Sequence, residues 1–245
     1  MSQVATHEIL WKGRTGPFSL LVRPGVFSPT STSRTMADAL EIGPDDTVID
    51  VGCGSGVLAF VAARLGAKKV YGCDLSMPAI EAARENAKRL GLQDICEFRY
   101  GDLLEPVRDV HATVLIGDVS GIPDELAKVS GWFEDVPSGG PTGAELPRKL
   151  LESIGDTLTA GGRLYLPTGD LQDESAIIAA ARRIFGDNME SVMEREFPLP
   201  DLVAKAQATA RMMKEGLLNL HKRGSRMLWS LRIWRCVRPD ALPSA

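Results

Sequence analysis

A turn rich in glycine is the feature whose residue types and spacing best fit ligand binding. It follows an apolar run that ends in Asp50 and Val51, and it includes Cys53. Its three glycines occupy alternate positions, Gly52, Gly54 and Gly56. Glycine is needed where the backbone turns tightly and lets a ligand approach closely. The pattern therefore predicts a ligand-binding turn that joins a strand to a helix.

The spacing of these glycines separates two classes of ligand. Proteins that bind nicotinamide or flavin dinucleotides need the pattern Gly-x-Gly-x-x-Gly. Here the third glycine of that pattern is replaced by Val57, and the observed spacing is Gly-x-Gly-x-Gly. A nicotinamide-dependent dehydrogenase is therefore the poorer fit.

Three further aspartates, Asp74, Asp102 and Asp118, each follow an apolar run. The carboxyl ends of parallel strands line the ligand crevice in open α/β sheets. A carboxylate at Asp74 can accept hydrogen bonds from both hydroxyls of a ribose. One aspartate in such a place also occurs as a helix cap or a turn residue. Four at successive strand ends, counting Asp50, indicate a crevice for a ribose-containing ligand.

These motifs resemble the cofactor-binding half of class I S-adenosylmethionine-dependent methyltransferases over residues 46–104. Residues 50–56 resemble the first motif of that class, 74–87 the second, and 101–102 the third. The resemblance implies that S-adenosyl-L-methionine is the cofactor and S-adenosyl-L-homocysteine the product. It also implies that the glycine turn lies under the amino-acid part of the cofactor.

The same resemblance assigns the other end of the cofactor. Asp74 would hold the ribose, with Leu75 beside it, and Asp102 and Leu103 would flank the adenine. A cofactor-binding set follows, which comprises Asp50, Gly52, Cys53, Gly54, Gly56, Asp74, Leu75, Asp102, Leu103 and Asp118. Four cysteines without a C-x-x-C pair and only three scattered histidines predict no metal site and no disulfide framework.

Residues 139–164 are more loosely similar to the second half of release-factor glutamine methyltransferases, with Pro29 and the helix after it as the substrate-side entry. Where that family has Asn-Pro-Pro-Tyr, this chain has residues 118–121, Asp-Val-Ser-Gly. The Asp-x-x-Gly pattern is closer to the acidic loop of protein arginine methyltransferases.

Asp118 has two possible roles in this interpretation. As a catalytic residue it would orient or deprotonate the N–H or O–H of the methyl acceptor. As a cofactor-binding residue it would accept a hydrogen bond from the amino group of the cofactor. Ser120 and Trp132 are the predicted substrate contacts. Trp132 and Phe133 belong to a stretch rich in Gly and Pro, residues 121–147, which is either a lid over the substrate or packed core.

The elements that position these residues alternate along the chain. Apolar runs predict strands at 47–51, 69–73, 96–100, 114–116 and 163–166, and helical periodicity predicts helices at 58–65, 77–90 and 147–158. This alternation predicts an α/β fold: a mostly parallel seven-stranded Rossmann-like sheet with helices on both faces. An N-terminal β-hairpin at 8–14 and 18–23 and a helix at 31–40 precede it. A helix at 202–214 and an antiparallel pair, 217–222 with 226–237, complete the sheet.

Composition and charge set the remaining expectations. We expect a single domain over residues 1–245, divided into 1–45, a cofactor-binding core at 46–170 and a sheet-completing part at 171–245. No apolar run reaches the ~18 residues of a membrane span, and no secretory signal precedes the domain, so we expect a cytoplasmic protein. Net charge is −4, although residues 201–245 carry nine Lys and Arg against three Asp and Glu.

Three functions remain open at this stage. The leading expectation is methyl transfer to O or N of a small metabolite or natural product. The alternative is a protein side-chain N-methyltransferase, and the third is a catalytically idle cofactor-binding or scaffold protein. Net acidity and the absence of an aromatic-interleaved basic stripe predict no nucleic-acid partner, and the oligomeric state stays open.

Overall fold

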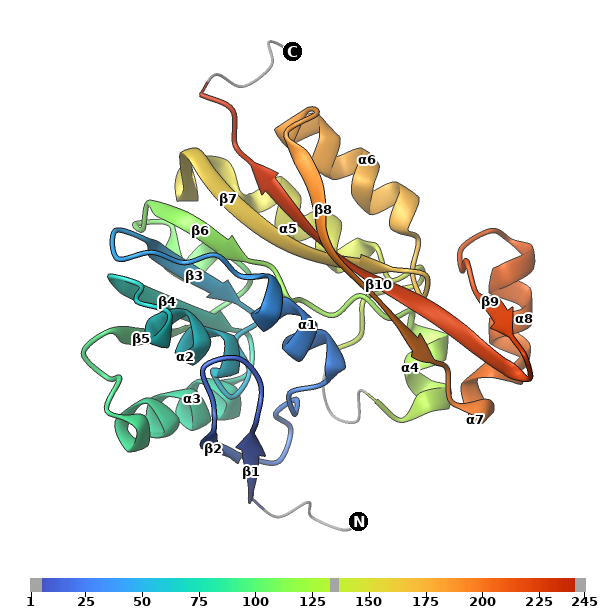
Figure 1. Cartoon of the computed structure of the whole chain (residues 1–245), viewed down its shortest axis with the longest axis horizontal. Helices are drawn as coiled ribbons and strands as arrows, with labels where there is room; N and C mark the ends of the chain where they lie inside the picture. Colours follow the sequence, from blue (N-terminus) through green and yellow to red (C-terminus); the bar gives the residue numbers. More distant parts are fainter. Residues whose placement is uncertain (1–5, 133–136, 241–245) are drawn as a thin grey trace.

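The main sheet of the computed structural model, which describes residues 6–132 and 137–240, contains eight strands in that part of the chain. Seven of them lie in the order β5-β4-β3-β6-β7-β10-β8, and the short β9 pairs with β10 (Figure 1). The five strands from β3 to β7 run parallel, whereas β10 runs antiparallel to both of its long neighbours. The strands are β3 (Thr47–Val51), β4 (Lys69–Asp74), β5 (Cys96–Tyr100), β6 (Ala112–Ile116), β7 (Leu158–Gly169), β8 (Met189–Pro198), β9 (His221–Arg223) and β10 (Arg226–Val237).

The central parallel strands β3 and β6 are largely apolar because helices cover both of their faces. In β3, Val48 packs into one hydrophobic core and the next residue, Ile49, packs into the other. Val114 and Leu115 in β6 divide between the same two cores. Successive side chains of a strand point to opposite faces, so a strand buried on both faces needs a continuous apolar run.

The helices that cover the sheet fall into two groups. α1 (Ser31–Ala39), α2 (Val57–Arg64) and α3 (Met77–Leu90) share one core, and α5 (Glu145–Ser153) with α6 (Glu174–Phe185) share the other. The short 3₁₀ turns are Glu105–Val107 and Gly155–Thr157. α3 has the predicted bounds because Ser76 caps its first turn and Gly91 ends it with a φ of 68°. The α/β architecture predicted from the sequence is confirmed.

The C-terminal edge of the sheet differs from the prediction. The antiparallel pair of β9 and β10 is present, but it does not end the sheet, because β8 pairs with the other side of β10 and forms the edge. β8 and α6 had no predicted counterpart. Most side chains of β8 are half-buried or exposed, as suits an edge strand, so it lacks the apolar run that marks the central strands.

A third hydrophobic core joins segments that lie beyond the sheet. It packs α4 (Asp124–Ser130), α7 (Asp201–Ala204) and α8 (Gln207–Lys214) against the segment before β9, and these elements form one end of the molecule (Figure 1). Two expectations are corrected here. The predicted 202–214 helix is interrupted at residues 205–206, and the 121–147 stretch contains helix α4 rather than only loop.

The N-terminal hairpin, β1 (His7–Trp11) with β2 (Phe18–Val22), is confirmed and packs beside α3 (Figure 1). Its attachment depends on Asn86, which is fully buried. The Asn86 side chain accepts from Leu21 N at 2.8 Å and donates to Leu21 O at 2.9 Å and to Ser55 O at 3.0 Å. One amide therefore joins the hairpin, α3 and the glycine turn.

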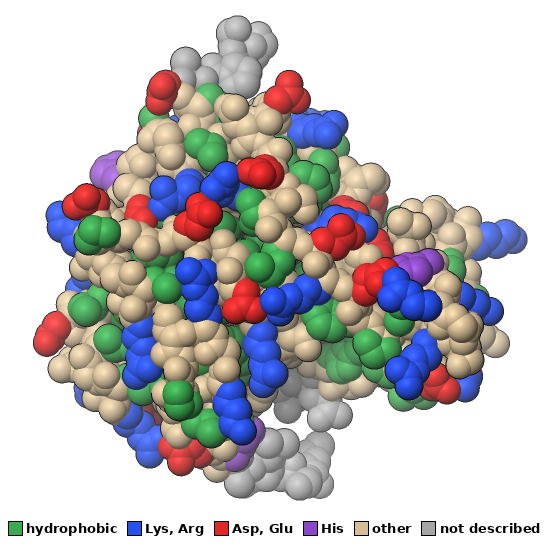
Figure 2. All heavy atoms as spheres, viewed as in Figure 1, with side chains coloured by type: hydrophobic (Ala, Val, Ile, Leu, Met, Phe, Trp, Pro, Cys, Tyr) green, Lys and Arg blue, Asp and Glu red, His purple; other side chains and the backbone are tan. Residues whose placement is uncertain are grey.

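The basic residues of the C-terminal segment are largely paired. Arg232 contacts Asp170 and Glu174, Arg235 contacts Glu41 and Glu190, and Arg211 contacts Glu125. Figure 2 shows Lys and Arg side chains interspersed with acidic ones on the face that it presents. Within the described residues, no helix combines the length and the apolar character that crossing a bilayer requires.

We expect Asn86→Ala to lower the free energy of unfolding by about 2–4 kcal/mol, because it leaves buried backbone groups of residues 21 and 55 without partners. Urea unfolding followed by circular dichroism measures the change. Asn219→Ala removes an exposed amide of the same type and should change stability by less than about 0.5 kcal/mol. Equal effects in the two variants would show that the buried amide does not hold the hairpin.

Candidate active site

A cavity of about 1050 Å³ opens at the carboxyl edge of the parallel strands. The segments after β3, β4, β5, β6 and β7 all contribute to its wall. Residues 25–33, which lead into α1, line it as well, as do Phe197 of β8 and Trp229 of β10. This is the position in which open α/β sheets bind ligands.

The glycine turn lies at the bottom of this cavity. Gly52, Gly54 and Gly56 have φ values of 71°, 52° and 92°, a region that favours glycine. Gly56 does not belong to the cavity wall. It begins α2, and a Cβ there would lie 2.7 Å from the ring of Phe60, so its role in this structure is close packing.

Asp50 is buried beneath the turn, with 1% of its surface exposed. Its Oδ2 accepts a hydrogen bond from Ala59 N at 3.0 Å, in the first turn of α2. Burial raises the pKa of Asp50 well above the usual range of a carboxyl, and the nearby Asp118 and Asp74 raise that pKa further. The first motif therefore uses its aspartate to begin the helix as well as to line the cavity.

Asp74 ends β4 and faces the same cavity. One carboxylate oxygen accepts from Gly54 N at 2.9 Å, and the other accepts from Ser76 N at 2.8 Å. Burial raises the pKa of Asp74, and these backbone hydrogen bonds partly oppose the rise. Each oxygen keeps a further lone pair, so the side chain can hold the glycine turn and still accept hydrogen bonds from a ligand.

Asp102 and Leu103 line the side of the cavity that follows β5. Asp102 forms an ion pair of 2.6 Å with Lys149 of α5, and Leu103 has a φ of 47° that is uncommon for a branched residue. Leu75 also lines the cavity and is 55% exposed. An apolar side chain so exposed at a cavity is suited to the face of a planar ring.

Asp118 follows β6 at the centre of the cavity. The hydroxyl of Ser33 in α1 lies 3.5 Å from its Oδ2. Burial raises the pKa of Asp118 to about 6, although the contact with Ser33 lowers it in part. Asp50, Asp74 and Asp118 therefore make this part of the cavity acidic and suited to a cationic group.

The two predicted substrate residues also lie in the cavity wall. The hydroxyl of Ser120 donates to Pro137 O at 2.9 Å, so it holds the following loop. Trp132 packs at the edge of the third hydrophobic core as well as lining the cavity. Phe133 lies outside the described residues. The binding roles of Ser120 and Trp132 stay predictions.

Several wall residues were not among the predicted site residues. They are Ser33, Gln172, Phe197 and Trp229. Phe197 and Trp229 stand on neighbouring strands with ring centroids 5.3 Å apart. The four aspartates stand at the ends of β3, β4, β5 and β6, and Gln172 follows β7, the next parallel strand. Its position after a strand could therefore have predicted that it lines the cavity.

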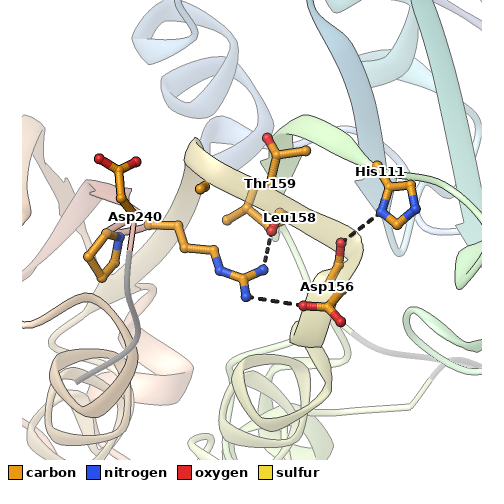
Figure 3. A pocket seen from close by; sticks show the side chains of 8 residues that line it. His111, Asp156, Leu158, Thr159 and Asp240 are labelled. Carbon is orange, nitrogen blue, oxygen red and sulfur yellow. Dashed lines mark hydrogen bonds and ion pairs between the residues drawn. The ribbon is translucent and has the colours of Figure 1, made fainter. Parts of the chain in front are cut away.

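A second cavity, of about 320 Å³, lies at the opposite edge of the sheet. His111, Asp156, Leu158, Thr159 and Asp240 surround it (Figure 3). Its one arginine, Arg238, donates to the carbonyl oxygens of Gly155 and Leu158 and pairs with Asp156. These contacts hold the end of β10 against the start of β7. The presence of an arginine in this cavity is therefore explained by structural contacts, and no ligand is needed to account for it.

Comparison with known proteins places the site in a class. Residues 28–124 match the family described as ribosomal protein L11 methyltransferase (PrmA). The chain is 38% identical over 117 residues to the ribosomal protein L11 methyltransferase of Alkaliphilus metalliredigens, which covers 44% of this chain and 37% of the relative. It is 32% identical over 184 residues to the release factor glutamine methyltransferase of Moorella thermoacetica, which covers 70% of this chain and 64% of the relative.

The chain thus spans roughly a third to two thirds of the length of these relatives. In fold it is similar to the tRNA m1G37 methyltransferase of M. jannaschii, with a TM-score of 0.61 at 15% identity over 96% of this chain and 55% of the other. These matches confirm the resemblance to class I S-adenosylmethionine-dependent methyltransferases that the sequence motifs predicted. S-adenosylmethionine is the cofactor of this class.

The cavity fits that cofactor. Ser55 is 2% exposed, and its Oγ has no hydrogen-bond partner within the described residues. Ser55 lines the cavity between Gly54 and α2, where a carboxylate of a ligand can accept from a hydroxyl and from helix N–H groups. The acidic centre suits the ammonium and sulfonium groups of the same molecule.

We expect Asp74→Ala to weaken S-adenosylhomocysteine binding by about 1–3 kcal/mol, because ribose hydroxyls and Gly54 N lose an acceptor in a buried site. Isothermal titration calorimetry measures the affinity, and circular dichroism checks that the variant is folded. Asp94→Ala, at an exposed turn, should bind like the parent protein. Unchanged affinity in a folded Asp74→Ala protein would show that this carboxylate does not contact the ribose.

The raised pKa of Asp118 predicts how the affinity for S-adenosylmethionine changes with pH. Below a pKa of about 6 the side chain is neutral, and above it the side chain is anionic. S-adenosylmethionine carries a sulfonium charge that S-adenosylhomocysteine lacks. Its affinity should therefore rise between about pH 5 and about pH 7, relative to that of S-adenosylhomocysteine. Calorimetry across this range should show a flatter profile in Asp118→Asn, and an equally steep profile would assign the titration to another group.

Proposed function

We propose that this protein transfers the methyl group of S-adenosylmethionine to a nitrogen of a protein side chain. The observation that carries the proposal is the position of Asp118 beside a cavity that extends beyond the glycine turn. The two sequence relatives support it, because they act on ribosomal protein L11 and on a release factor according to their names. The likeness to release-factor glutamine methyltransferases predicted from residues 139–164 agrees with the second of these.

The chemistry requires little covalent participation by the protein. The lone pair of the acceptor nitrogen forms a bond to the methyl carbon while the carbon–sulfur bond breaks, its electrons stay on sulfur, and the nitrogen loses a proton. The protein holds the acceptor in line and excludes water. Ionised Asp118 can orient the N–H of the acceptor and take up its proton directly or through water.

A small metabolite is the second candidate acceptor, and one feature of the cavity favours it. Trp132, Phe197 and Trp229 line the cavity together, and such aromatic walls bury the apolar part of a compact ligand. The named relatives do not support this reading, because their names specify protein substrates. Methyl transfer to a protein is therefore the main proposal.

The test is transfer of tritium from methyl-labelled S-adenosylmethionine. We expect label in protein when the enzyme is incubated with ribosomal protein L11, a release factor and total cell protein. Asp118→Asn should retain S-adenosylhomocysteine binding within about threefold and lower turnover by about 10²–10⁴-fold, the usual contribution of a positioned acid–base group. Gel separation and mass spectrometry locate the label.

Asp94→Asn provides a matched control, since it makes the same chemical change at an exposed turn. Label that appears only in compounds of low molecular mass would support the second candidate. A loss of cofactor binding in Asp118→Asn, equal to the loss of turnover, would assign Asp118 to the amino group of the cofactor instead of the acceptor.

A further inference from the structure

Gln172 is a buried polar side chain of the cavity that the cofactor contacts above do not use. It is 8% exposed and lines the cavity at the end of β7. Its Nε2 is buried and has no hydrogen-bond partner among the residues that the structure describes. A buried donor without a partner destabilises the folded protein, so such groups are rare and call for an explanation.

The surroundings of Gln172 fix its amide beside the acceptor side of the cavity. Gly121, three positions after Asp118, contacts the amide so closely that a Cβ there would overlap Oε1. A Cβ at Gly143 would lie 2.9 Å from Gln172 Cβ. The backbone on the other side is held as well, because Asp173 N donates to Thr142 O at 3.0 Å. Two glycines therefore provide the room that this amide occupies.

We propose that Gln172 is a specificity-determining residue of the acceptor site and that its Nε2 donates a hydrogen bond to an oxygen of the acceptor. The inference rests on the proposed function, since it assumes that an acceptor enters this cavity. When ionised, Asp118 accepts hydrogen bonds and donates none, whereas Nε2 of Gln172 donates and accepts none. Together they match an acceptor group with both an N–H and a neighbouring oxygen.

This pairing discriminates between kinds of acceptor. A simple amine offers an N–H to Asp118 but leaves the Gln172 donor buried without a partner. A carboxamide offers its N–H to one residue and its oxygen to the other. Sites built to pair a polar group reject analogues that lack it, because the protein's own buried group is then left unpaired.

Binding of two bisubstrate probes tests the proposal without any turnover. Both probes are S-adenosylhomocysteine with nitrogen in place of sulfur. One carries a propionamide arm on that nitrogen, and the other carries an isopentyl arm of the same shape. We expect the parent protein to bind the propionamide probe about tenfold more tightly than the isopentyl probe. Calorimetry at one pH gives both affinities.

Gln172→Met keeps the length of the side chain and removes the donor. We expect this variant to bind both probes equally, to bind S-adenosylhomocysteine like the parent, and to unfold at the same or a higher temperature, because the lost donor had no partner. Gly121→Ala leaves residue 172 unchanged but displaces its amide, and it should also abolish the preference. Gln93→Met makes the same change at an exposed position and should preserve it.

Two results would overturn the proposal: a parent protein without preference between the probes, or a full preference that survives in a folded Gln172→Met protein. If Gln172→Met does not fold, Gly121→Ala decides the question by the same ratio of affinities. A failure of the proposed function would be recognised by a different result. A preference for the propionamide probe in an enzyme that labels no protein would leave the role of Gln172 intact and exclude only the protein acceptor.

Discussion

Two carboxylates, buried Asp50 and half-buried Asp74, hold the turn on which the predicted cofactor site depends. Asp50 accepts from Ala59 N and so fixes the start of α2, while Asp74 accepts from Gly54 N and fixes the middle of the turn. Glycine can adopt many backbone conformations, including left-handed ones. The hydrogen bonds of these two side chains stabilise the single conformation that the turn adopts. Asp74 also lines the cavity, so a carboxyl group that builds the turn is available to a ligand as well.

Parallel strands explain how residues so distant in the sequence meet. Every strand from β3 to β7 ends at one edge of the sheet, and each end contributes a polar side chain to the cavity. The order of the strands then separates two halves. Asp74 and Asp102 follow β4 and β5 on the cofactor side, whereas Gln172 follows β7 on the other side, and Asp118 stands between them after β6.

The sequence predicted the elements around the glycine turn well because short local signals specify them. The turn at 52–56, the capped helix α3 and the aspartates after successive strands can each be recognised within a few residues. The acceptor half depends on contacts between distant segments, which no local pattern records. Phe197 and Trp229 meet only because β10 enters the sheet beside β8. β8 itself is an edge strand with a mostly exposed, charged sequence, so periodicity did not reveal it.

The position of β10 between β7 and β8 has a consequence for synthesis of the chain. The ribosome makes β7 and β8 before β10. Because β10 lies between them in the sheet, neither strand can complete its pairing until β10 has been made. Until then two rows of backbone N–H and C=O groups stay unpaired, which is a state prone to incorrect strand pairing. Among the strands from β3 to β6, each later strand instead adds to an edge that already exists. A nascent chain can therefore assemble the strands around the glycine turn while the cavity wall that contains Phe197 and Trp229 is still incomplete.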